Sequence, residues 1–358
     1  MSTAVNQEGF MRRCFELAQR GIGRVSPNPM VGCVIVGDGK IIAEGYHRFF
    51  GGPHAEVEAL NVLSMNGISN LKELELYVNL EPCNHFGKTP PCTDAIVRSG
   101  IRKVIVSNVD PNPMVAGQGI RKLKTSGITV QTGLLSDDGA FLNRRFMTLH
   151  TLKRPYVILK WAQSRDGYIA PNEVARAVAK KPFWISGEAS RQLVHKWRSE
   201  EQGILVGRKT IEDDDPQLTC RHPNGTDPVR IIVDPSLSLN LNHQAFSKSG
   251  RVLILNHLQQ FKKDHLEYIK FKSNQVQSML DAIHTCGILS VMVEGGKKTL
   301  DAFLQADLWD EARVFTGNID LKEGLHAPTL SMKPHFSQHI AEDHLEIFYR
   351  RTSYHHGN

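Results

Sequence analysis

Short apolar runs of strand length alternate with helix-like segments along most of the chain, and this alternation constrains the fold more than any other feature. In the first half, the runs MVGCVIVG (30–37) and LELYVNL (74–80) flank the helix-like segment HAEVEALNVLSM (54–65). In the second half, PYVILKWA (155–162) and SVMVEGG (290–296) are runs of the same kind. Strands that alternate with helices predict layered α/β domains with largely parallel sheets.

The remaining elements follow from the same pattern. Asp38-Gly39, between the runs 30–37 and 40–47, predicts a tight hairpin. CTDAIVRSG (92–100) is expected to be a short helix that ends at Gly100. Further strands are expected at 103–109, 128–133, 203–210, 228–234, 251–256 and 311–317, and further helices at 187–200 and 297–308.

The alternation breaks once, near NRRFMTLHTLKRP (143–155). The halves on either side share no internal repeat and carry different motifs, and 358 residues is a length typical of two domains. We therefore predict one α/β domain over residues 1–150 and a different one over residues 151–358.

Composition narrows the class of protein. No stretch approaches the roughly 18 apolar residues that a membrane span requires, and the first residues lack the apolar core of a secretory signal. The six cysteines are scattered, so we expect no disulfide framework and a cytoplasmic location. The net charge of +6 comes without a basic stripe carrying interleaved aromatics. We expect no nucleic-acid or membrane partner, and a homo-oligomer, either a dimer or a tetramer.

The stretch LEPCNHFGKTPPC (80–92) places two cysteines nine positions apart. Cys83 and Cys92 could be metal ligands, a disulfide or unrelated core residues. Cys83 follows a predicted strand, Cys92 opens a predicted helix, and His54 stands at the start of another helix. Zinc binds imidazole and thiolate, and a catalytic zinc keeps one of its four positions for water. These three residues therefore predict a catalytic zinc site.

Glu56 completes this pattern. Residues two apart on a helix point in different directions, so Glu56 would not ligate the same ion as His54 but could reach a water on it. His-x-Glu followed by Pro-Cys and a second cysteine is the signature of zinc deaminases, except that their second cysteine usually lies three positions after the first. His-x-Glu alone, or two cysteines alone, often occur by chance in a sequence. Their occurrence together and in this order favours the deaminase interpretation.

Two alternatives remain for this half. A nucleic-acid-editing deaminase with an appended binding domain would carry the short C-x-x-C spacing and a basic, aromatic-bearing surface. A protein with a purely structural zinc would need a fourth protein ligand, for which His85 is the candidate.

PNPMVGCVIV, GYHRFFGGPHAEVEAL and PCNHFGKTPPC together resemble the deaminase half of the bifunctional riboflavin-biosynthesis deaminase–reductases. The last stretch matches every fixed position of the family pattern P-C-x-H-x-G-x-T-P-P-C. The resemblance implies a cytidine-deaminase-like three-layer α/β/α domain. It also implies deamination at C2 of 2,5-diamino-6-ribosylamino-4(3H)-pyrimidinone 5′-phosphate, with Glu56 as the proton carrier.

Other polar positions are assigned less directly. We expect Asn28, Gly32 and His47 near the pyrimidine, although Asn28 before a proline is also a common turn residue. His85 and Lys88 could contact the phosphate or ring, or simply be exposed loop residues.

The second half has no G-x-G-x-x-G fingerprint, so a standard Rossmann site is disfavoured. Its Gly295-Gly296 between a strand and a helix would let a phosphate approach backbone N–H groups, or could be merely a turn. The motifs VEGG (293–296), LKWAQSRDGYIA (159–170) and WRSEEQGILVGRKTIEDDDPQLTCR (197–221) resemble the reductase half of the same family.

The reductase resemblance implies a dihydrofolate-reductase-like α/β domain that uses NADPH to reduce the opened ribosyl group. Lys160 and Glu294 would be catalytic, polarising and protonating the sugar. The implied substrate contacts are Arg198, Asp214, Leu218, Arg221 and Glu294. The implied cofactor contacts are Trp184, Ser186, Thr210, Asp214, Gly296, Lys297, Lys298 and Thr299.

Each reductase residue also has a plain structural alternative. Arg198 could only solvate a helix surface, and the acidic run around Asp214 is a common kind of solvated cluster. The chain also departs from the family at Arg165, where an apolar residue is usual, and over the longer segment 171–183. The departure leaves open the substrate contact expected at Pro182 and the local cofactor contacts.

Overall fold

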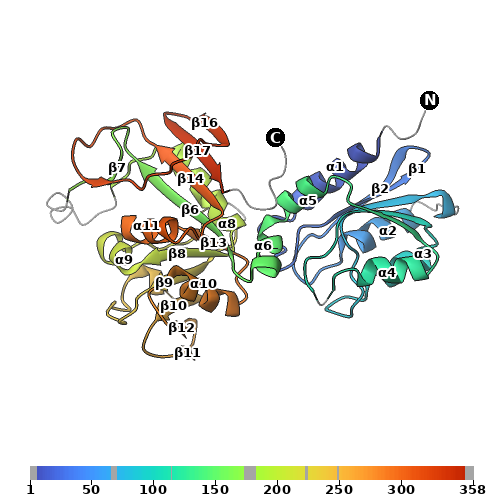
Figure 1. Ribbon diagram of the computed structural model, residues 1–358, viewed down its shortest axis with the longest axis horizontal. Helices are drawn as coiled ribbons and strands as arrows, with labels where there is room; N and C mark the ends of the chain where they lie inside the picture. The colour runs from blue at the N-terminus through green and yellow to red at the C-terminus, as the bar shows by residue number, and fades with distance from the viewer. Residues whose placement is uncertain are drawn as a thin grey trace. The chain divides into compact units, whose positions relative to one another are not determined.

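The computed structural model describes residues 6–65, 71–113, 115–172, 183–221, 225–247 and 250–350 (Figure 1). By internal contacts the chain divides into two compact units, Met1–Leu152 and Lys153–Thr352. Each unit is an α/β structure with its own sheet and its own apolar core.

The sheet of the first unit has the strand order β2-β1-β3-β4-β5. Its strands are β1 (Gly32–Gly37), β2 (Lys40–Tyr46), β3 (Glu75–Leu80), β4 (Lys103–Asn108) and β5 (Thr129–Thr132). The predicted hairpin is confirmed: Asp38 and Gly39 have φ values of 50° and 70°, which suits a tight turn between β1 and β2. Because β1 also pairs antiparallel with β3, the sheet is mixed and the prediction of a largely parallel sheet was wrong here.

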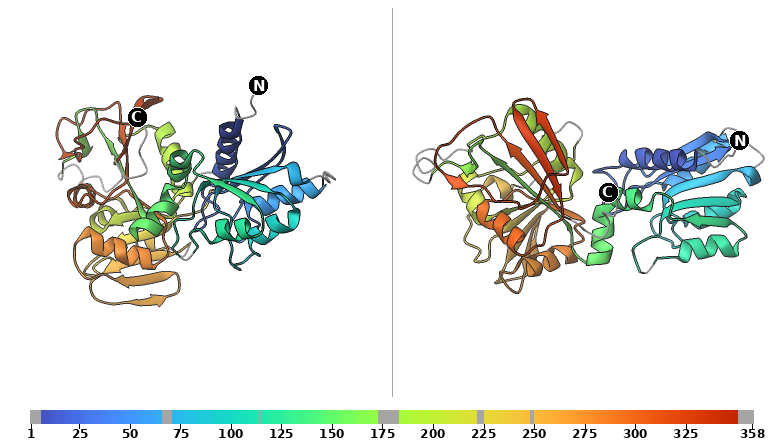
Figure 2. Two further views of the ribbon diagram at one scale, coloured as in Figure 1. Left: turned by 45° about the vertical axis from the view of Figure 1, so that its right-hand side comes forward. Right: turned by 45° about the horizontal axis from the view of Figure 1, so that its top comes forward.

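Helices cover both faces of this sheet, which makes three layers (Figures 1 and 2). The helices are α1 (Gln7–Gln19), α2 (Ala55–Met65), α3 (Cys92–Ser99), α4 (Gln118–Thr125), α5 (Ser136–Leu142) and α6 (Arg144–Leu152), with a short 3₁₀ turn, η2 (Leu71–Glu73). Cys33 and Ile35 of β1 face the core that contains α2, whereas Val34 and Val36 face the core that contains α1. This alternation of period two is what a strand buried on both faces requires.

The second unit contains a sheet of order β11-β12-β10-β9-β8-β13-β6-β14-β17-β16. Its strands are β6 (Tyr156–Gln163), β8 (Gly203–Gly207), β9 (Val229–Val233), β10 (Val252–Asn256), β11 (Phe261–Lys263), β12 (Leu266–Lys270), β13 (Ser290–Val293), β14 (Glu311–Thr316), β16 (Phe336–Ile340) and β17 (Asp343–Tyr349). The strands from β12 to β14 in this order run parallel, and antiparallel strands close both edges. The short strands β7 (Tyr168–Ala170) and β15 (Leu325–His326) pair separately.

Helices again lie on both faces of the sheet. They are α8 (Glu188–Glu200), α9 (Arg208–Asp214), α10 (Val276–Thr285) and α11 (Lys297–Gln305), with a 3₁₀ turn, η3 (Gln244–Phe246). α10 and α11 share one apolar core, and α8 packs into another. The carboxyl ends of the parallel strands β13, β8 and β9 meet at one edge, and such an edge is where α/β sheets bind ligands.

Two sequence assignments in this unit need correction. Residues 208–210 were expected to continue a strand, but β8 ends at Gly207 and α9 begins at Arg208. The helix α10 was not predicted, although Val276, Met279, Leu280 and Ile283 follow helical spacing and are buried.

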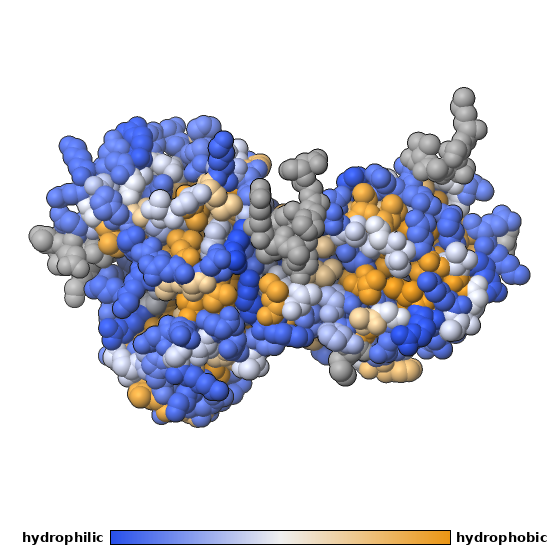
Figure 3. All heavy atoms as spheres, in the orientation of Figure 1, coloured by the Kyte–Doolittle hydropathy of each residue, from blue (hydrophilic) through white to orange (hydrophobic). Residues whose placement is uncertain are grey.

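The surface in Figure 3 is mainly hydrophilic, and apolar side chains gather in patches between charged ones. Within the described ranges, no helix is both long and apolar enough to cross a membrane.

Candidate active sites

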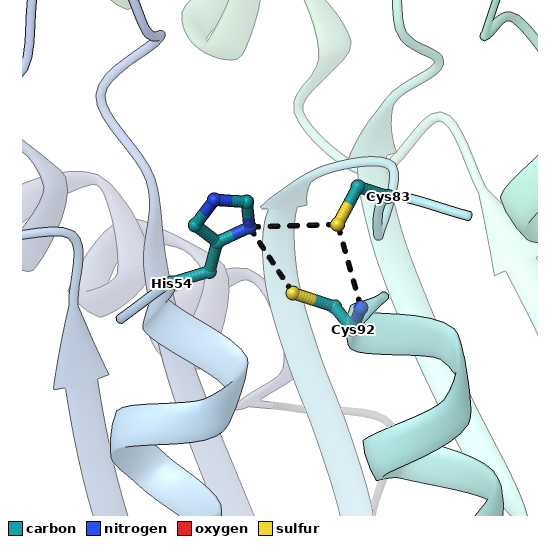
Figure 4. Close-up of side chains that lie close together, drawn as sticks. All are labelled: His54, Cys83 and Cys92. Carbon is teal, nitrogen blue, oxygen red and sulfur yellow. Dashed lines mark hydrogen bonds between the residues drawn. The ribbon is translucent and has the colours of Figure 1, made fainter. Parts of the chain in front are cut away.

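The side chains of His54, Cys83 and Cys92 converge in the first unit, and their ligand atoms all lie within 4.8 Å of one another. His54 immediately precedes α2, Cys83 follows β3, and Cys92 is the first residue of α3. Nδ1 of His54 lies 3.2 Å from the Cys92 Sγ and 3.5 Å from the Cys83 Sγ, so the imidazole points at both sulfurs (Figure 4). Three segments distant in sequence thus supply one donor cluster.

The donor set fits zinc. With Zn–N of about 2.1 Å and Zn–S of about 2.3 Å in tetrahedral geometry, an imidazole nitrogen and a thiolate sulfur lie about 3.6 Å apart. The 3.2 and 3.5 Å separations of the cluster are close to this value. The other ring nitrogen of His54 lies 3.5 Å from the Thr89 hydroxyl, a partner that fixes the ring orientation. The cluster provides three protein ligands, the number found in catalytic zinc sites.

The electrostatics favour thiolate at Cys83 and not at Cys92. The hydrogen bond with Cys92 is the largest influence on Cys83, and together with the His54 side chain it lowers the pKa of the Cys83 thiol to about 4 despite burial. The same contact, followed by burial, raises the pKa of the Cys92 thiol, so in the absence of a metal ion the pair shares one proton. His85 is not part of the cluster, so the described residues do not supply the fourth ligand that a purely structural zinc would need.

Replacing Cys83 with serine should therefore reduce the zinc content from about one ion per chain to well below that value, because a hydroxyl is a poor zinc ligand. Metal analysis of the purified full chain measures this directly. Cys286→Ser is the matched control, since Cys286 is a free, partly exposed cysteine outside the cluster. Stoichiometric zinc in the Cys83 variant would show that this thiol is not a ligand.

Glu56 lies on the second residue of α2 and is only 3% exposed. Burial, reinforced by the neighbouring Cys83, raises the pKa of the Glu56 carboxyl to about 7. It does not belong to the ligand cluster. A buried carboxyl beside a metal site, with a pKa near neutrality, can both accept and return a proton.

His47 and Asn28 lie beside this cluster. The His47 ring lies edge-on to that of His54, with 5.3 Å between centroids. Its Nδ1 lies 2.9 Å from the Pro53 carbonyl oxygen, which can only accept, so Nδ1 carries the proton and Nε2 accepts from the Asn28 amide at 3.1 Å. Burial lowers the pKa of His47, which favours this neutral form. The Asn28 amide is therefore held in one orientation.

Gly32, in contrast, has a packing role. A Cβ at this position would lie 2.1 Å from the Cys14 carbonyl oxygen of α1. The close approach of β1 to α1 accounts for this glycine without any substrate contact. The loop residues His85 and Lys88 are exposed, and the Lys88 Nζ lies 4.0 Å from the centre of the Phe50 ring.

Sequence reasoning missed Glu81, which lies two residues before Cys83 and is 4% exposed. Its carboxylate accepts four backbone N–H bonds, from Asp110, Gly117, Gly119 and Ile120, at 2.8 to 3.2 Å. Glu81 thereby ties the segment after β4 to the end of β3, where Cys83 stands. Glu81-Pro82-Cys83 was visible in the sequence, but its four partners become neighbours only in the folded unit.

Glu81→Gln should lower the free energy of unfolding by about 2–4 kcal/mol, because the amide keeps one acceptor oxygen and turns a donor toward buried N–H groups. Chemical denaturation of the full chain measures the loss. Glu73→Gln, an exposed position on η2, is the matched control and should change little. Equal stability of the two variants would show that the four bonds do not stabilise this unit.

The second unit has a cleft of about 1450 Å³ at the carboxyl ends of its parallel strands. All the residues predicted for the reductase site line it. They are Lys160, Trp184, Ser186, Arg198, Thr210, Asp214, Leu218, Arg221, Glu294, Gly296, Lys297, Lys298 and Thr299. The expected contact at Pro182 lies outside the described residues, as does most of the atypical segment 171–183.

A buried ion triad lines this cleft. Arg198 of α8 donates from Nε and Nη2 to the two carboxylate oxygens of Glu294, at 3.0 and 2.8 Å. Lys160 Nζ of β6 lies 3.9 Å from the same carboxylate. The alternative in which Arg198 only solvates a helix surface is excluded, because its side chain is 14% exposed and bidentate.

The triad fixes the protonation of its members. Burial pushes the pKa of Glu294 upward, but Arg198 and Lys160 outweigh burial and hold it at about 2. Burial lowers the pKa of Lys160, opposed by Glu294 and assisted by Arg198. Glu294 is therefore ionised at neutral pH and cannot donate a proton, whereas Lys160 can.

The starts of two helices, α9 and α11, line the cleft beside each other. Gly296 precedes α11 in an extended conformation, and its N–H donates to the Thr210 hydroxyl of α9 at 3.1 Å. A Cβ on Gly207, which precedes α9, would lie 2.8 Å from the Thr299 hydroxyl. Backbone N–H groups at a helix start favour an anionic phosphate, so this part of the cleft fits the diphosphate of a dinucleotide.

Several cleft residues carried no prediction. His195 of α8 accepts the Arg221 N–H on Nδ1 at 3.2 Å, and burial followed by Arg198 and Arg221 lowers its pKa to about 4. Arg191 packs over the exposed Trp184 ring, 5.0 Å from its centre. At position 165 the chain departs from the family. The exposed Arg165 side chain there forms an ion pair with Asp320, at 2.6 Å.

Comparisons with known proteins agree with this geometry. Residues 4–108 match the family model of the cytidine and deoxycytidylate deaminase zinc-binding region, and residues 155–337 match that of the RibD C-terminal domain. The chain is similar to the riboflavin biosynthesis protein RibD of Aquifex aeolicus, with 37% identity over 96% of this chain and 98% of that protein. It is 33% identical to RibD of Escherichia coli over 87% of each chain.

A crystal structure from Thermotoga maritima, described as a diaminohydroxyphosphoribosylaminopyrimidine deaminase/5-amino-6-(5-phosphoribosylamino)uracil reductase, matches with a TM-score of 0.84. It is 38% identical and covers 96% of this chain and 98% of its own. Fold and sites thus define a cytidine-deaminase-like zinc domain followed by a dihydrofolate-reductase-like domain. The chain belongs to the RibD family of bifunctional riboflavin-biosynthesis deaminase–reductases.

Proposed function

We propose that the first domain removes the C2 amino group of 2,5-diamino-6-ribosylamino-4(3H)-pyrimidinone 5′-phosphate. The observation that carries this proposal is the His54–Cys83–Cys92 cluster with Glu56 buried beside it. The substrate is supported by the relative from Thermotoga maritima, whose description specifies this deaminase activity. The long spacing from Cys83 to Cys92 argues against a nucleic-acid-editing enzyme, in which a C-x-x-C pair is expected.

Each residue then has a defined task. His54, Cys83 and Cys92 would hold a zinc ion, which would make water nucleophilic at neutral pH. Glu56 would carry two protons in turn: the first from the attacking water to the ring nitrogen, and the second from the resulting hydroxyl to the amine, which leaves as ammonia while the ring carbon keeps a carbonyl oxygen. Asn28, held by His47, presents its amide toward the pyrimidine.

We propose that the second domain uses NADPH, the source of hydride, to reduce C1′ of the opened ribosyl group. Arg198 and Arg221 suit the 5′-phosphate because guanidinium binds phosphate through a planar fork. Asp214 and Leu218 would contact the substrate, and Asp214 would also contact the cofactor. Trp184, Ser186, Thr210 and the segment from Gly296 to Thr299 would line the cofactor.

In this proposal Lys160 donates the proton to the sugar ring oxygen as the ring opens. Glu294 acts as a carboxylate that orients Lys160 and Arg198, because its pKa of about 2 keeps it ionised. From the sequence, Lys160 and Glu294 were expected to polarise and protonate the sugar together. The proposal instead gives proton donation to Lys160 and orientation to Glu294.

One coupled assay tests both halves. The full chain with zinc should release ammonia from the diaminopyrimidinone and then oxidise NADPH with the product. Ammonia release without NADPH oxidation would contradict the reductase. NADPH oxidation with the deaminated compound, but no ammonia release from the diaminopyrimidinone, would contradict the deaminase. We also propose domain limits of 1–150 and 151–358, a cytoplasmic location and a homo-oligomer. Sedimentation of the purified chain would test the oligomeric state.

A further inference from the structure

The chain segment that carries Asn28 ends where the sheet of the first domain begins. β1 starts at Gly32, and its pairing with β2 and β3 begins at Gly32 and Cys33. Pro29 lies between Asn28 and Met30. A proline fixes its own φ and restricts the residue before it to extended conformations, so few rotations separate Asn28 from Met30. The place of Asn28 therefore depends on how Met30 is held.

A buried side-chain amide holds both backbone polar groups of Met30. The Met30 N–H donates to Oδ1 of Asn143 at 2.8 Å, and Nδ2 of Asn143 donates to the Met30 carbonyl oxygen at 2.9 Å. Asn143 stands between α5 and α6 and is 3% exposed. Because Oδ1 can only accept and Nδ2 can only donate, this pair of bonds requires the amide in this one orientation.

A second buried amide holds the same segment. Asn79 of β3 is 1% exposed. Its Nδ2 also donates to the Met30 carbonyl oxygen, at 2.9 Å, and its Oδ1 accepts the Gly32 N–H at 2.8 Å. A carbonyl oxygen has two lone pairs and can accept from both amides. Four hydrogen bonds from Asn79 and Asn143, which we call the asparagine pair, thus fix the backbone from Met30 to Gly32.

The imidazole that orients Asn28 is tied to the same segment. The His47 N–H donates to the Val31 carbonyl oxygen at 2.9 Å. The His47 Nε2 lies 3.1 Å from Nδ2 of Asn28. Since Val31 stands between Met30 and Gly32, the segment fixed by the asparagine pair supports both Asn28 and the ring that orients its amide.

Resting on the proposed deamination, we propose that Asn79 and Asn143 are positioning residues that place Asn28 for the pyrimidine. They act through the backbone of Met30 and not on the substrate itself. A displacement of about 1 Å in a positioning contact can lower a reaction rate about 10²-fold. Buried asparagines often serve the fold alone, because a buried amide must be hydrogen-bonded. In that case the effect of removing them would not depend on Asn28.

The kinetics of ammonia release by the zinc-loaded full chain test this role. Asn143→Ala should lower kcat/KM by about 10- to 100-fold. The zinc content should stay unchanged, because the ligands are other residues. In a chain that already carries Asn28→Ala, adding Asn143→Ala should lower kcat/KM by less than about 3-fold, since the residue that it positions is gone. Asn79→Ala, which leaves the bonds from Asn143 intact, should show the same dependence on Asn28.

Tyr77→Phe is the matched control. Tyr77 is 1% exposed and packs in the same apolar core as Met30, and its hydroxyl donates to Glu75 at 2.6 Å. The variant loses one hydrogen bond of the same domain and leaves the bonds of Met30 intact. Its kcat/KM for ammonia release should change by less than about 3-fold.

A crystal structure of Asn143→Ala tests the same role without turnover, and in it Asn28 should lie beyond hydrogen-bond distance of His47. An Asn28 that stays at His47, or an equal kinetic loss with and without Asn28→Ala, overturns the positioning role while the deamination stands. A loss of the same size in Tyr77→Phe overturns it as well. If the wild type releases no ammonia, the proposed deamination fails instead, and the crystal structure still decides whether the asparagine pair holds Asn28 in place.

Discussion

Replacing Glu56 with glutamine should leave the zinc content unchanged and reduce ammonia release by about 10²- to 10⁴-fold, the usual contribution of a positioned acid–base group. Glutamine keeps the size of the side chain and its buried place on α2, where Glu56 is 3% exposed, but it cannot take up a proton. The ligands His54, Cys83 and Cys92 are untouched. The variant is therefore expected to keep its zinc while it loses most of its ammonia release.

The matched control is Glu58→Gln, two residues further along α2. Glu58 pairs with Arg48 at 3.1 Å on the surface and does not belong to the metal cluster. Its replacement should change ammonia release less than about 3-fold, in keeping with the small contribution of an exposed ion pair. Loss of zinc from the Glu56 variant would make Glu56 a ligand, and undiminished ammonia release would remove it from the reaction.

The metal site could be predicted from the sequence because its ligands lie where elements begin and end. His54, Cys83 and Cys92 each adjoin a helix or strand boundary that the apolar pattern defines. Glu56 could be separated from the ligands by helical spacing alone. What could not be predicted was the clamp formed by Glu81, because its partners lie 29 to 39 residues further along the chain and are backbone groups without any sequence signature.

In the second domain, too, local motifs could be recognised in the sequence, whereas contacts between distant elements could not. Gly295-Gly296 followed by a helix was recognisable, and the cleft indeed places Gly296 beside Thr210. The ion triad needs three elements, β6, α8 and the end of β13, to meet, and only the family resemblance brought its members together beforehand. The mixed sheet of the first domain was mispredicted because alternation of strands and helices does not reveal where a hairpin strand is inserted. The start of α9 was missed because β8 runs directly into it at Gly207.

Replacing Glu294 with glutamine should reduce NADPH oxidation by at least about 10²-fold, because the carboxylate orients both the proton donor Lys160 and the guanidinium of Arg198. Ammonia release by the same chain should be unchanged and serves as an internal control. Glu267→Gln is the matched variant: Glu267 accepts two bonds from Arg251, both at 2.9 Å, but neither residue lines the cleft. It should leave NADPH oxidation unchanged.

The pH dependence distinguishes this role of Glu294 from a merely structural one. Burial lowers the pKa of Lys160 and Glu294 raises it, so removing the Glu294 charge lowers that pKa further. Activity that needs the protonated amine is lost as the pH rises through this pKa. The alkaline limb of kcat/KM should therefore move to lower pH in Glu294→Gln and should be absent from the residual activity of Lys160→Met. The pKa of Lys160 must fall when the neighbouring negative charge is removed. An unshifted alkaline limb in Glu294→Gln would therefore mean that Lys160 is not the proton donor.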